Sequence, residues 1–463
     1  MSTVNRIDSI LSSSHIGDNV ELQGWVRTKR IGKSVAFLTI NDGSTFKNIQ
    51  VVIDLDTVNV GVLDNVNTGT SVFISGSVVK SVGCEQDIEI KLTYLSVLGY
   101  ANGFPIQPKK HSMEFLRDIA HLRFRTNTFS AIFRIRNRIC FAIHKFFQER
   151  GFVYVNTPLI TSSDAEGAGE MFTVTSLDLR EIRHDIDFNN DFFGEHVNLT
   201  VSGQLEAEAA IFGLGAVYTF GPTFRAENSN TTRHLAEFWM VEPEMAFYDL
   251  KGDMQLVEDF FKYVISDVLD KCHDELVFLN EKLKKENGTS LIDKLENTIS
   301  ASFNVITYSD ALDILKRDDA KFTYTVDTWG CDLQSEHEKY IVDKVFNSKP
   351  VIVIDYPKSL KAFYMRLNDD NRTVAAMDVL FSGIGEIVGG SQREERLDYL
   401  NQAIEQRGIK TDAVKWYLDT RRFGSVVHAG FGLGLERLVQ YVTGIDNIRD
   451  VIPFPRYPGH AKY

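Results

Sequence analysis

The sequence predicts an α+β protein made of two parts, a small N-terminal β-barrel and a larger domain that mixes helices with strands. Two patterns lead to this prediction. Apolar and polar residues alternate with the period of a strand over residues 18–99, and apolar residues then recur with helical spacing over 129–150. A stretch with two prolines and a glycine, 102–110, separates the two patterns.

The first part holds about five strand-like runs within about 100 residues. These runs are 20–27, 36–40, 49–53, 71–76 and 88–90. The turn signal Asn41-Asp42-Gly43-Ser44 separates the second run from the third. So many short strands in so little chain favour a closed barrel of the OB kind. We therefore expect an OB domain over 1–102 and a linker or hinge over 103–128.

The second part, 129–463, begins with the amphipathic helix, which ends at Gly151. A strand over 152–155 follows and stops before Pro158. The rest mixes long helices with strands, including a charge-rich helical insertion around 251–345. Within that insertion, charges recur at helical spacing over 251–295, which predicts a solvated helical face.

Composition and charge narrow the class of protein. Apolar residues make up 43% and charged residues 24% of the 463, which is typical of a soluble globular protein. No apolar run approaches the ~18 residues of a membrane span, and the first residues lack a secretory signal pattern, so we expect a cytoplasmic location. The net charge of −13 repels nucleic acid, so a nucleic-acid partner would have to bind a local basic patch. We expect no DNA partner. The four cysteines form no CxxC pair, so we expect reduced, buried thiols and no structural zinc.

Two segments imitate nucleotide-binding motifs without matching them. Gly32-Lys33-Ser34 resembles the end of a P-loop, but Arg27 stands where the loop needs its first glycine. The run Gly432-Leu433-Gly434 begins like a dinucleotide fingerprint, but Arg437 replaces the third glycine. Neither motif supports a function.

Residues 220–238 read as a strand, a polar loop and a second strand. The loop carries the cations Arg225, Arg233 and His234, with Glu227 among them, and it leads into Phe238. Arginine offers a planar fork of donors that suits phosphate, and an aromatic ring can stack on a base. A nucleotide site and a surface loop with salt bridges explain this segment equally well.

Two further segments carry candidate groups near glycines. In 431–438, glycines precede a helix that starts with Glu436 and Arg437; they suit either a bound ligand or tight helix–strand packing with Arg437 in an ion pair. In 377–393, Asp378 and Glu386 could hold Mg²⁺, which takes few carboxylates together with substrate phosphates. Taken alone, that segment favours a strand-edge acid in water.

Together these segments resemble the class II aminoacyl-tRNA synthetases of the aspartyl/asparaginyl branch. Three pieces match the motifs of that family in order: the helix–strand segment ending at Pro158, the Phe224-Arg225-Ala226-Glu227 loop with Arg233-His234, and the Gly432 to Arg437 end piece. The resemblance covers nearly the whole chain. It implies a catalytic domain built on an antiparallel sheet flanked by helices, preceded by an anticodon-binding OB domain.

The resemblance also implies the chemistry. An amino-acid carboxylate attacks the α-phosphorus of ATP, with Mg²⁺ as cofactor, and the aminoacyl group then passes from the adenylate to the 3′ end of tRNA. The implied partners are tRNA-Asn, L-asparagine and a second copy of the chain, which would pair through the helix before Pro158. No nucleophilic side chain is needed, because the protein mainly positions reactants and stabilises charge.

Residue roles follow from the same resemblance. The catalytic residues would be Arg225, Glu227 and Arg437. The ATP site would comprise Arg225, Glu227, Arg233, His234, Leu235, Phe238, Glu386, Gly434, Glu436 and Arg437, with Glu386 and Asp378 as the metal ligands. The amino acid would meet Glu166, Gln204, Glu206, Ala207, Arg225, Glu242, Gly389 and Arg393. The anticodon would meet Arg27, Phe37 and Gln50.

The choice of amino acid depends on one position. Aspartyl members place a lysine where this chain has Ala207, and they often place a serine where it has Gly389. Without that lysine, a second substrate carboxylate lacks a cation, whereas the neighbouring glutamates can accept from an amide NH₂. We therefore expect asparagine as the substrate. An enzyme that takes aspartate or both amino acids, and a tRNA-binding paralogue without catalysis, are the alternatives.

Overall fold

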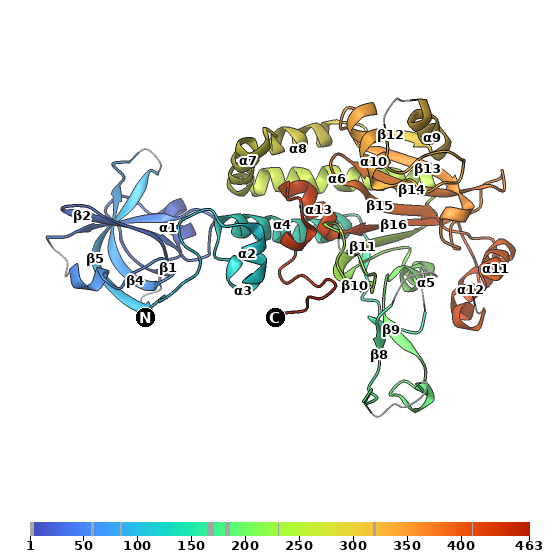
Figure 1. Ribbon diagram of the computed structural model, residues 1–463, viewed down its shortest axis with the longest axis horizontal. Helices are drawn as coiled ribbons and strands as arrows, with labels where there is room; N and C mark the ends of the chain where they lie inside the picture. The colour runs from blue at the N-terminus through green and yellow to red at the C-terminus, as the bar shows by residue number, and fades with distance from the viewer. Residues whose placement is uncertain are drawn as a thin grey trace. The chain divides into compact units, whose positions relative to one another are not determined.

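The computed structural model describes residues 4–56, 60–83, 86–163, 171–180, 186–229, 231–317, 321–409 and 411–463. The chain divides into two compact units, 1–131 and 132–463 (Figure 1). The first unit is all blue to cyan in the figure and the second runs from cyan to red.

The first unit contains the predicted barrel. Its strands close in the order β1-β2-β3-β5-β4. They are β1 (Asn19–Ile31), β2 (Val35–Asn41), β3 (Ile49–Asp54), β4 (Ser71–Lys80) and β5 (Ile88–Gly99). Alternate residues point inward, as the period-2 pattern predicts, and helix α1 (Ile7–Ser13) adds Ile7 and Ile10 to the barrel core. The backbone of β5 comes so close to β4 at Gly76 that a Cβ there would lie 2.5 Å from the Lys91 carbonyl oxygen. The prediction of an OB barrel is confirmed.

The segment expected as a linker carries short structure of its own. It contains α2 (Met113–Asp118), which Ser112 caps, and α3 (Ala120–Arg123). The Arg125 guanidinium lies 4.4 Å from the centre of the Phe104 ring and donates to the Gly69 carbonyl at 2.7 Å. These contacts tie the end of the first unit to its own barrel.

The second unit is built on an eight-stranded sheet in the order β12-β13-β14-β15-β16-β11-β10-β6. The strands are β6 (Val153–Tyr154), β10 (Ala216–Phe224), β11 (Glu237–Ala246), β12 (Asn304–Thr307), β13 (Val351–Pro357), β14 (Thr373–Phe381), β15 (Gly385–Gln392) and β16 (His428–Gly434). The pairs from β13 to β10 are antiparallel, as predicted, whereas β12–β13 and β6–β10 are parallel. The edge pairs are parallel because helices lie between their strands in the chain, and a crossover lets the second strand run the same way.

Helices cover both faces of this sheet. The chain crosses from the first unit into the second within α4 (Asn127–Glu149), whose Phe147 stacks on Tyr218 at 4.6 Å. The adjacent Val217 points the other way and packs with Ala207 and Ile211 of α5 (Gln204–Leu214). Helix α4 and helix α5 therefore lie on opposite faces of β10.

The long helix α6 (Leu250–Lys271) corrects the prediction of a solvated helical face. One side of it is fully buried, including Val257, Phe260, Phe261, Val264, Ile265 and Val268. Phe260 packs edge-on against Phe146 of α4 at 5.2 Å. Apart from the buried Asp253, the charged residues lie outside this buried side, so the charge pattern described mainly one face of a core helix.

The remaining helices surround the sheet (Figure 1). They are α7 (His273–Asn287), α8 (Leu291–Ser300), α9 (Tyr308–Arg317), α10 (Ser335–Tyr340), α11 (Leu397–Gln406), α12 (Lys415–Arg422) and α13 (Leu435–Thr443). A small sheet joins β7 (Ile160–Thr161), β9 (Val197–Leu199) and β8 (Thr173–Val174). Among the described helices, none has the length and apolar character needed to cross a membrane.

Candidate active site

Strand order brings the three candidate segments together. The sheet places β15, β16, β11 and β10 side by side, although β16 and β10 lie about 200 residues apart in the chain. Gly389 of β15 pairs with Gly432 of β16, and Met240 of β11 pairs with Gly434. The polar loop after β10, the acidic β14–β15 pair and the start of α13 therefore share one part of the second unit.

Arg225 and Phe238 face each other across the base of the polar loop. Arg225 follows the last residue of β10, and its backbone N–H donates to the Ala236 carbonyl at 3.0 Å. Its guanidinium lies 5.4 Å from the centre of the Phe238 ring. The antiparallel hairpin thus holds the Arg225 guanidinium beside the Phe238 ring, as the nucleotide interpretation requires.

Arg233 and His234 come from the same loop. The Arg233 guanidinium donates to the Ser335 hydroxyl and to the Ile384 carbonyl, which ties the loop to α10 and to the β14–β15 turn. Burial, aided by the guanidinium groups of Arg437, Arg233 and Arg225, lowers the pKa of His234, although Glu227 opposes the shift. Three guanidinium groups therefore lie near His234, although burial is the main cause of its lowered pKa.

Arg437 lies in the first turn of α13 (Leu435–Thr443) and reaches the acidic strand pair. Its Nη1 donates to the Glu386 backbone carbonyl at 2.7 Å and lies 3.6 Å from the Glu386 carboxylate. Desolvation opposes ionisation of Glu386, but Arg437 and Lys361 outweigh it and hold the pKa of Glu386 below its usual value. Glu386 is therefore an ionised acid beside an arginine.

Asp378 is buried in β14, so it is not the strand-edge acid in water that its segment alone favoured. Both of its oxygens accept from the Lys361 ammonium at 2.6 Å. Burial raises the pKa of Asp378 although Lys361 opposes the shift. A Cβ on Gly389 would lie 3.4 Å from a Glu386 oxygen and 3.8 Å from Asp378, so the two carboxylates approach each other where the glycine leaves room.

This acid pair fits Mg²⁺ in its donor chemistry. Magnesium keeps several waters and takes one or two carboxylates together with substrate phosphates. Among the described residues, no group of three or more ligating side chains is arranged to hold a metal by itself. A metal at Glu386 and Asp378 would therefore need oxygen ligands from the substrate.

Glu338 of α10 lies beside Glu386, a contact that the sequence did not predict. Its Oε2 accepts from the backbone N–H of Glu386 at 3.0 Å. Burial and the charges of Glu386 and Asp378 raise its pKa to about 7. The positive φ of Gly385, +82°, and its missing side chain let Glu338 come this close.

The ATP site was also expected to include Glu436, Leu235, Glu227 and Gly434. Glu436 is buried, pairs with Arg136 at 2.7 Å and accepts from the Trp239 N–H at 3.0 Å. Glu436 thus forms a buried ion pair, and Arg437, for which an ion pair was expected, lies 3.6 Å from the Glu386 carboxylate. Leu235 is buried, Glu227 is exposed, and a Cβ on Gly434 would meet open space at the start of α13.

The expected amino-acid contacts gather at the start of α5. Glu242 is buried and accepts from the Gly203 N–H at 3.0 Å, the Thr219 hydroxyl at 2.9 Å and the Ser202 hydroxyl. Burial raises the pKa of Glu206, and the charge of Glu242 adds to the shift. Glu206 also lines an open cleft of about 340 Å³ together with Ile160, Ser163, Phe193 and Trp416.

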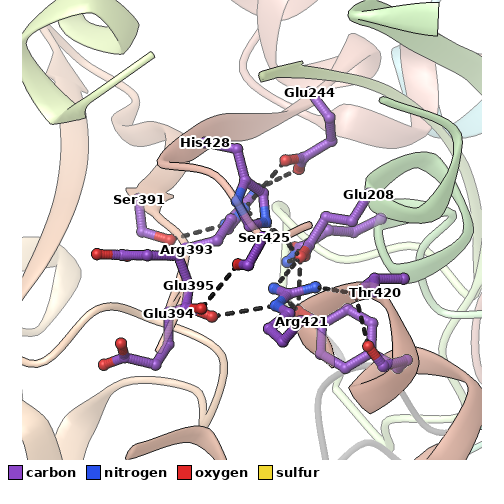
Figure 2. A network of polar contacts seen from close by, with 12 residues as sticks. Glu208, Glu244, Ser391, Arg393, Glu394, Glu395, Thr420, Arg421, Ser425 and His428 are labelled. Atoms are coloured by element: carbon purple, nitrogen blue, oxygen red, sulfur yellow. Dashed lines mark hydrogen bonds and ion pairs between the residues drawn. The ribbon is translucent and has the colours of Figure 1, made fainter. Parts of the chain in front are cut away.

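Arg393 is held rigidly on the same face of the sheet. Its Nε and Nη2 donate to the two oxygens of Glu244, and its Nη1 donates to the Ser391 hydroxyl at 2.7 Å (Figure 2). An arginine has five N–H donors, and among the described residues these bonds use three of them. The other two N–H groups form no hydrogen bond with the described residues.

Two expected contacts do not join this cluster. Ala207 is fully buried in an apolar cluster with Ile211, Val217 and Ala246, so it does not line the polar site directly. A side chain that turns inward on α5 at this position meets the core of the domain. Glu166 lies outside the described residues.

The structure adds four residues that the sequence analysis did not assign: Glu208, Glu244, Arg421 and His428. Glu208 follows Gln204 by four residues on α5 and accepts from its amide at 2.9 Å. That spacing on a helix was a usable signal, because residues four apart share a face. No sequence pattern linked Arg421 or His428 to this place.

Of the three expected anticodon residues, Phe37 and Gln50 lie close together on the barrel, whereas Arg27 does not join them. Phe37 and Gln50 are diagonal neighbours on β2 and β3, because Thr39 is the residue paired with Gln50. Arg30 pairs with Phe37 and lies over its ring at 4.9 Å. Arg27 stands at the irregularity in β1 and donates to Arg125 and Asn127, so Arg30 is the cation beside Phe37.

Comparison with known families covers both units. Residues 112–458 match the family described as tRNA synthetases class II (D, K and N), and residues 20–98 match the OB-fold nucleic acid binding domain. Curated relatives span the full length. The chain is 56% identical over 458 residues to an asparagine–tRNA ligase of Cytophaga hutchinsonii, which covers 98% of this chain and 97% of that protein. It is 55% identical over 465 residues to that of a Nostoc species, which covers 99% of each.

Solved structures agree with this similarity. The crystal structure of asparaginyl-tRNA synthetase from Pyrococcus horikoshii complexed with asparaginyl-adenylate matches with a TM-score of 0.87 at 32% identity and covers 100% of both chains. Asparaginyl-tRNA synthetase of Entamoeba histolytica in complex with asparaginyl-adenylate matches with a TM-score of 0.83 at 26% identity over 98% of both chains.

Proposed function

Because the chain belongs to the class II tRNA synthetases of the D, K and N group, we propose that it is an asparagine–tRNA ligase that activates L-asparagine with ATP and transfers it to tRNA-Asn. One observation of the site supports this most directly. Arg393 is already paired with Glu244, so it can donate to a carboxamide oxygen but has no spare charge for a second carboxylate. Full-length relatives named asparagine–tRNA ligase support the same choice.

The proposed first step uses charge rather than a nucleophile. Arg225 lies where it can bridge the α-phosphate and the substrate carboxylate, with Phe238 beside the adenine. Arg233, His234 and Arg437 would meet the outer phosphates and stabilise the leaving pyrophosphate. Fixed guanidinium groups contribute here because the charge on the α-phosphate develops in the transition state.

Magnesium would bind at Glu386 and Asp378 together with phosphate oxygens. When bound, it would supply a positive charge on the phosphates. Lys361 currently holds Asp378, so it sets the position of that carboxylate. Arg437 does the same for the backbone of Glu386.

The substrate asparagine would lie against α5 and the β11–β16 strands. Glu206 and Glu242 would accept from the amide NH₂ of asparagine, and Arg393 would donate to the side-chain oxygen. The same glutamates would repel the second carboxylate of aspartate. Selection against aspartate thus comes from like charge without a compensating cation.

On the barrel, the Phe37 ring would stack on the unstacked middle base of the anticodon. The Gln50 amide would form hydrogen bonds with the edge of that base. Arg30, which lies over Phe37, would add a local positive charge against the overall −13 of the chain. The proposed enzyme would act where translation takes place, in the cytoplasm.

We expect the enzyme to be a homodimer paired through α4 and β6. Phe141 of α4 and Val153 and Tyr154 of β6 are exposed large side chains on elements that lie at the edge of the sheet. Analytical ultracentrifugation should give twice the 52.4 kDa of the chain. A Phe141→Glu/Tyr154→Glu variant should sediment as a monomer, whereas a stable wild-type monomer at micromolar concentration would contradict the proposal.

ATP–pyrophosphate exchange with single amino acids tests the proposed function. We expect strong exchange with asparagine and at least about 100-fold weaker kcat/KM with aspartate. Comparable exchange with aspartate would indicate a non-discriminating enzyme. Tight tRNA binding without exchange for any amino acid would indicate a paralogue that has lost catalysis.

A further inference from the structure

We propose that Lys361 competes with the metal for Asp378, so that Mg²⁺ binds tightly only together with the nucleotide. The inference rests on the proposed function, because the Mg²⁺ concerned is the one that would accompany ATP. Lys361 is a positioning residue in this proposal. It acts on the site through Asp378 and does not need to touch the reacting atoms.

Lys361 forms a close ion pair with Asp378. It lies in the segment between β13 and β14, and its ammonium donates to both Asp378 oxygens at 2.6 Å. Only 16% of the Lys361 side chain and 12% of the Asp378 side chain are exposed. Water and salt therefore screen this pair less than they screen a surface pair.

Two further contacts hold Lys361 in this place. Its ammonium lies 3.9 Å from the centre of the Tyr356 ring, which is a cation–π contact. The Arg407 guanidinium donates to the backbone carbonyl of Lys361. Lys361 is thus held at its backbone and at its ammonium, and its charge stays on Asp378 rather than in the solvent.

The other expected metal ligand, Glu386, has a looser cation. Arg437 donates to the Glu386 backbone carbonyl at 2.7 Å, and its guanidinium lies 3.6 Å from the carboxylate. A Cβ on Gly389 would lie 3.4 Å from a Glu386 oxygen and 3.8 Å from an Asp378 oxygen, so both carboxylates border one place. A metal there would lie close to the Lys361 ammonium, which repels it and uses lone pairs of Asp378.

The charges around this place explain why the loss of Lys361 should have a large effect. Glu338, whose pKa is raised to about 7, adds a third acid through its bond to the Glu386 N–H at 3.0 Å. Within the described parts of the chain, the ion pairs of Asp378 and Glu386 are those with Lys361 and Arg437. Without Lys361, three acids at pH 8 would face one such cation, and their field would attract a divalent ion.

Other groups also act on the three acids, and they stay unchanged in the test. They are Arg225, Arg233 and Lys339, which act by charge, and Tyr356, whose hydroxyl bonds to Asp378. Because every variant below keeps these groups, a difference in metal binding between the wild type and a Lys361 variant reports the change at position 361.

A nucleotide would change this competition in two ways. Its phosphates supply the oxygen ligands that Mg²⁺ takes besides one or two carboxylates. Their negative charge also offers Lys361 another partner, so that the ammonium can leave Asp378. Metal and nucleotide would therefore strengthen the binding of each other by the same factor.

Titration of Mn²⁺, a spectroscopic probe for Mg²⁺ sites, tests the proposal by electron paramagnetic resonance. We expect free Lys361→Met to bind Mn²⁺ with a Kd at least about tenfold lower than that of the wild type, because a repelling charge is removed. The experiment is run at pH 8, because burial raises the pKa of Asp378 and a protonated carboxyl group does not bind metal.

The second arm adds α,β-methylene-ATP, with the protein-free complex of Mn²⁺ and nucleotide as the reference. The nucleotide should tighten Mn²⁺ binding to the wild type strongly. In Lys361→Met this gain should be at least about fivefold smaller, because the free site already binds the ion.

Three variants serve as controls. Lys361→Arg keeps the charge and should bind Mn²⁺ within about threefold of the wild type. Lys358→Met removes an exposed cation from the same segment and should match the wild type. Asp378→Asn in the Lys361→Met background should abolish the gain, which would locate the bound ion at this carboxylate.

A purely structural role for Lys361 predicts a loss of stability in Lys361→Met without any gain in Mn²⁺ affinity. Unchanged or weaker binding of Mn²⁺ to the free variant overturns the proposal, as does an equal gain in Lys361→Arg. If Lys361→Met does not fold, Lys361→Gln carries the test, because its amide can still donate to Asp378 but has no charge. It should lower the Kd at least about fivefold, and an unchanged Kd overturns the proposal.

The Mn²⁺ titration of the free enzyme needs neither amino acid nor tRNA, so it separates this inference from the proposed function. If the wild type shows no pyrophosphate exchange with asparagine but Lys361→Met binds Mn²⁺ more tightly, the proposed function fails and the competition at Asp378 holds. If the wild type shows exchange and the Kd is unchanged in the variant, only the role of Lys361 fails.

Discussion

At the scale of single residues, the site depends on side chains that are held before any substrate binds. Arg437 is fixed by the Glu386 carbonyl, Arg393 by Glu244, and Arg233 by Ser335. Guanidinium groups held in this way need little reorganisation when a phosphate or carboxamide arrives. A reaction without a covalent nucleophile requires arginines that the protein holds in place.

Removing either of the arginines proposed to bind phosphate should abolish most of the first step. We expect Arg225→Ala and Arg437→Ala each to lower kcat/KM for pyrophosphate exchange at least about 100-fold, which is typical for the loss of one donor to developing charge. Steady-state exchange measures this loss. Arg317→Ala, which removes an exposed guanidinium paired with Asp313, is the control and should retain full activity. Full exchange in either site variant would refute the assigned role.

Gly389 allows a test of the acidic pair. A serine there would place its Cβ 3.4 Å from Glu386 and 3.8 Å from Asp378, which is ordinary contact distance. We expect Gly389→Ser to fold normally and to reach half-maximal exchange at a lower Mg²⁺ concentration, because its hydroxyl adds an oxygen beside the two carboxylates. Mg²⁺ titrations of exchange measure the shift. An unchanged Mg²⁺ requirement would place the metal away from Gly389.

At the scale of elements, close strand packing determines the shape of the site. Gly430 of β16 pairs with Glu244 of β11, and a Cβ on Gly430 would come within 2.3 Å of the Pro243 carbonyl oxygen and 2.4 Å of the Glu244 carboxyl group. The position of Glu244, and through it that of Arg393, therefore depends on a glycine in the adjacent strand.

Gly430→Ala should destabilise the protein and disturb amino-acid binding together. We expect a loss of about 1–3 kcal/mol in the free energy of unfolding, as for overpacking in other cores. Urea unfolding measures it, and exchange assays should show a raised KM for asparagine. Gly221→Ala on β10, where a Cβ would meet open space, is the matched control and should be nearly neutral. Equal stability of the two variants would contradict the packing argument.

Helix α8 carries a half-buried lysine that should make stability depend on pH. Burial lowers the pKa of Lys294 to about 8, although Asp343 opposes the shift, and its ammonium lies 4.0 Å from the centre of the Tyr441 ring. The unfolded chain binds this proton more tightly, with a pKa near 10.4, so stability should rise as pH increases from about 8 to about 10.

Urea unfolding at pH 7.5 and pH 9.5 checks the sign of this effect. The wild type should gain on the order of 1–2 kcal/mol at the higher pH relative to Lys294→Met, in which the titrating group is absent. Lys285→Met, at an exposed site in the last turn of α7, should behave as the wild type. A wild type that loses stability relative to Lys294→Met over this interval would contradict the argument.

At the scale of the whole molecule, two compact units carry separate tasks. The first unit holds the aromatic and amide side chains expected to read a base, and the second holds the phosphate and amino-acid residues. Amino-acid activation needs only the second set of contacts. Charging of tRNA needs both.

A barrel variant should therefore separate the two activities. We expect Phe37→Ala to lower kcat/KM for tRNA charging by about 10- to 100-fold, which corresponds to the stacking of one base, and to leave pyrophosphate exchange unchanged. Aminoacylation with tRNA-Asn and exchange without tRNA measure the two effects. Thr93→Ala on β5, which removes an exposed hydroxyl bonded to the Ser75 carbonyl, is the control. A parallel loss of both activities would show that Phe37 supports folding instead.

Local patterns were sufficient for the order of the elements, whereas the antiparallel sheet and the nucleotide end of the site were expected from the family resemblance. Alternation with period 2 predicted the barrel strands, and the helical spacing of apolar residues predicted α4 to within a few residues. The roles of Arg225, Phe238, Glu386 and Arg437 were predicted from the family resemblance, because each segment taken alone suited a structural explanation at least as well. The charge-rich pattern of 251–295 misled because it described only the outer side of α6, whose other side is core.

What the sequence determined by itself was the succession of elements and the identity of the charged groups, because both are local properties of the chain. The tertiary structure decided which charges meet. Glu208 and Arg421 are separated by more than 200 residues, and Arg393 and Glu244 by about 150, yet strand order and helix packing bring them into one buried network. Local spacing cannot predict such pairs, because the energy of a buried charge depends on partners that only the folded chain brings within a few ångströms.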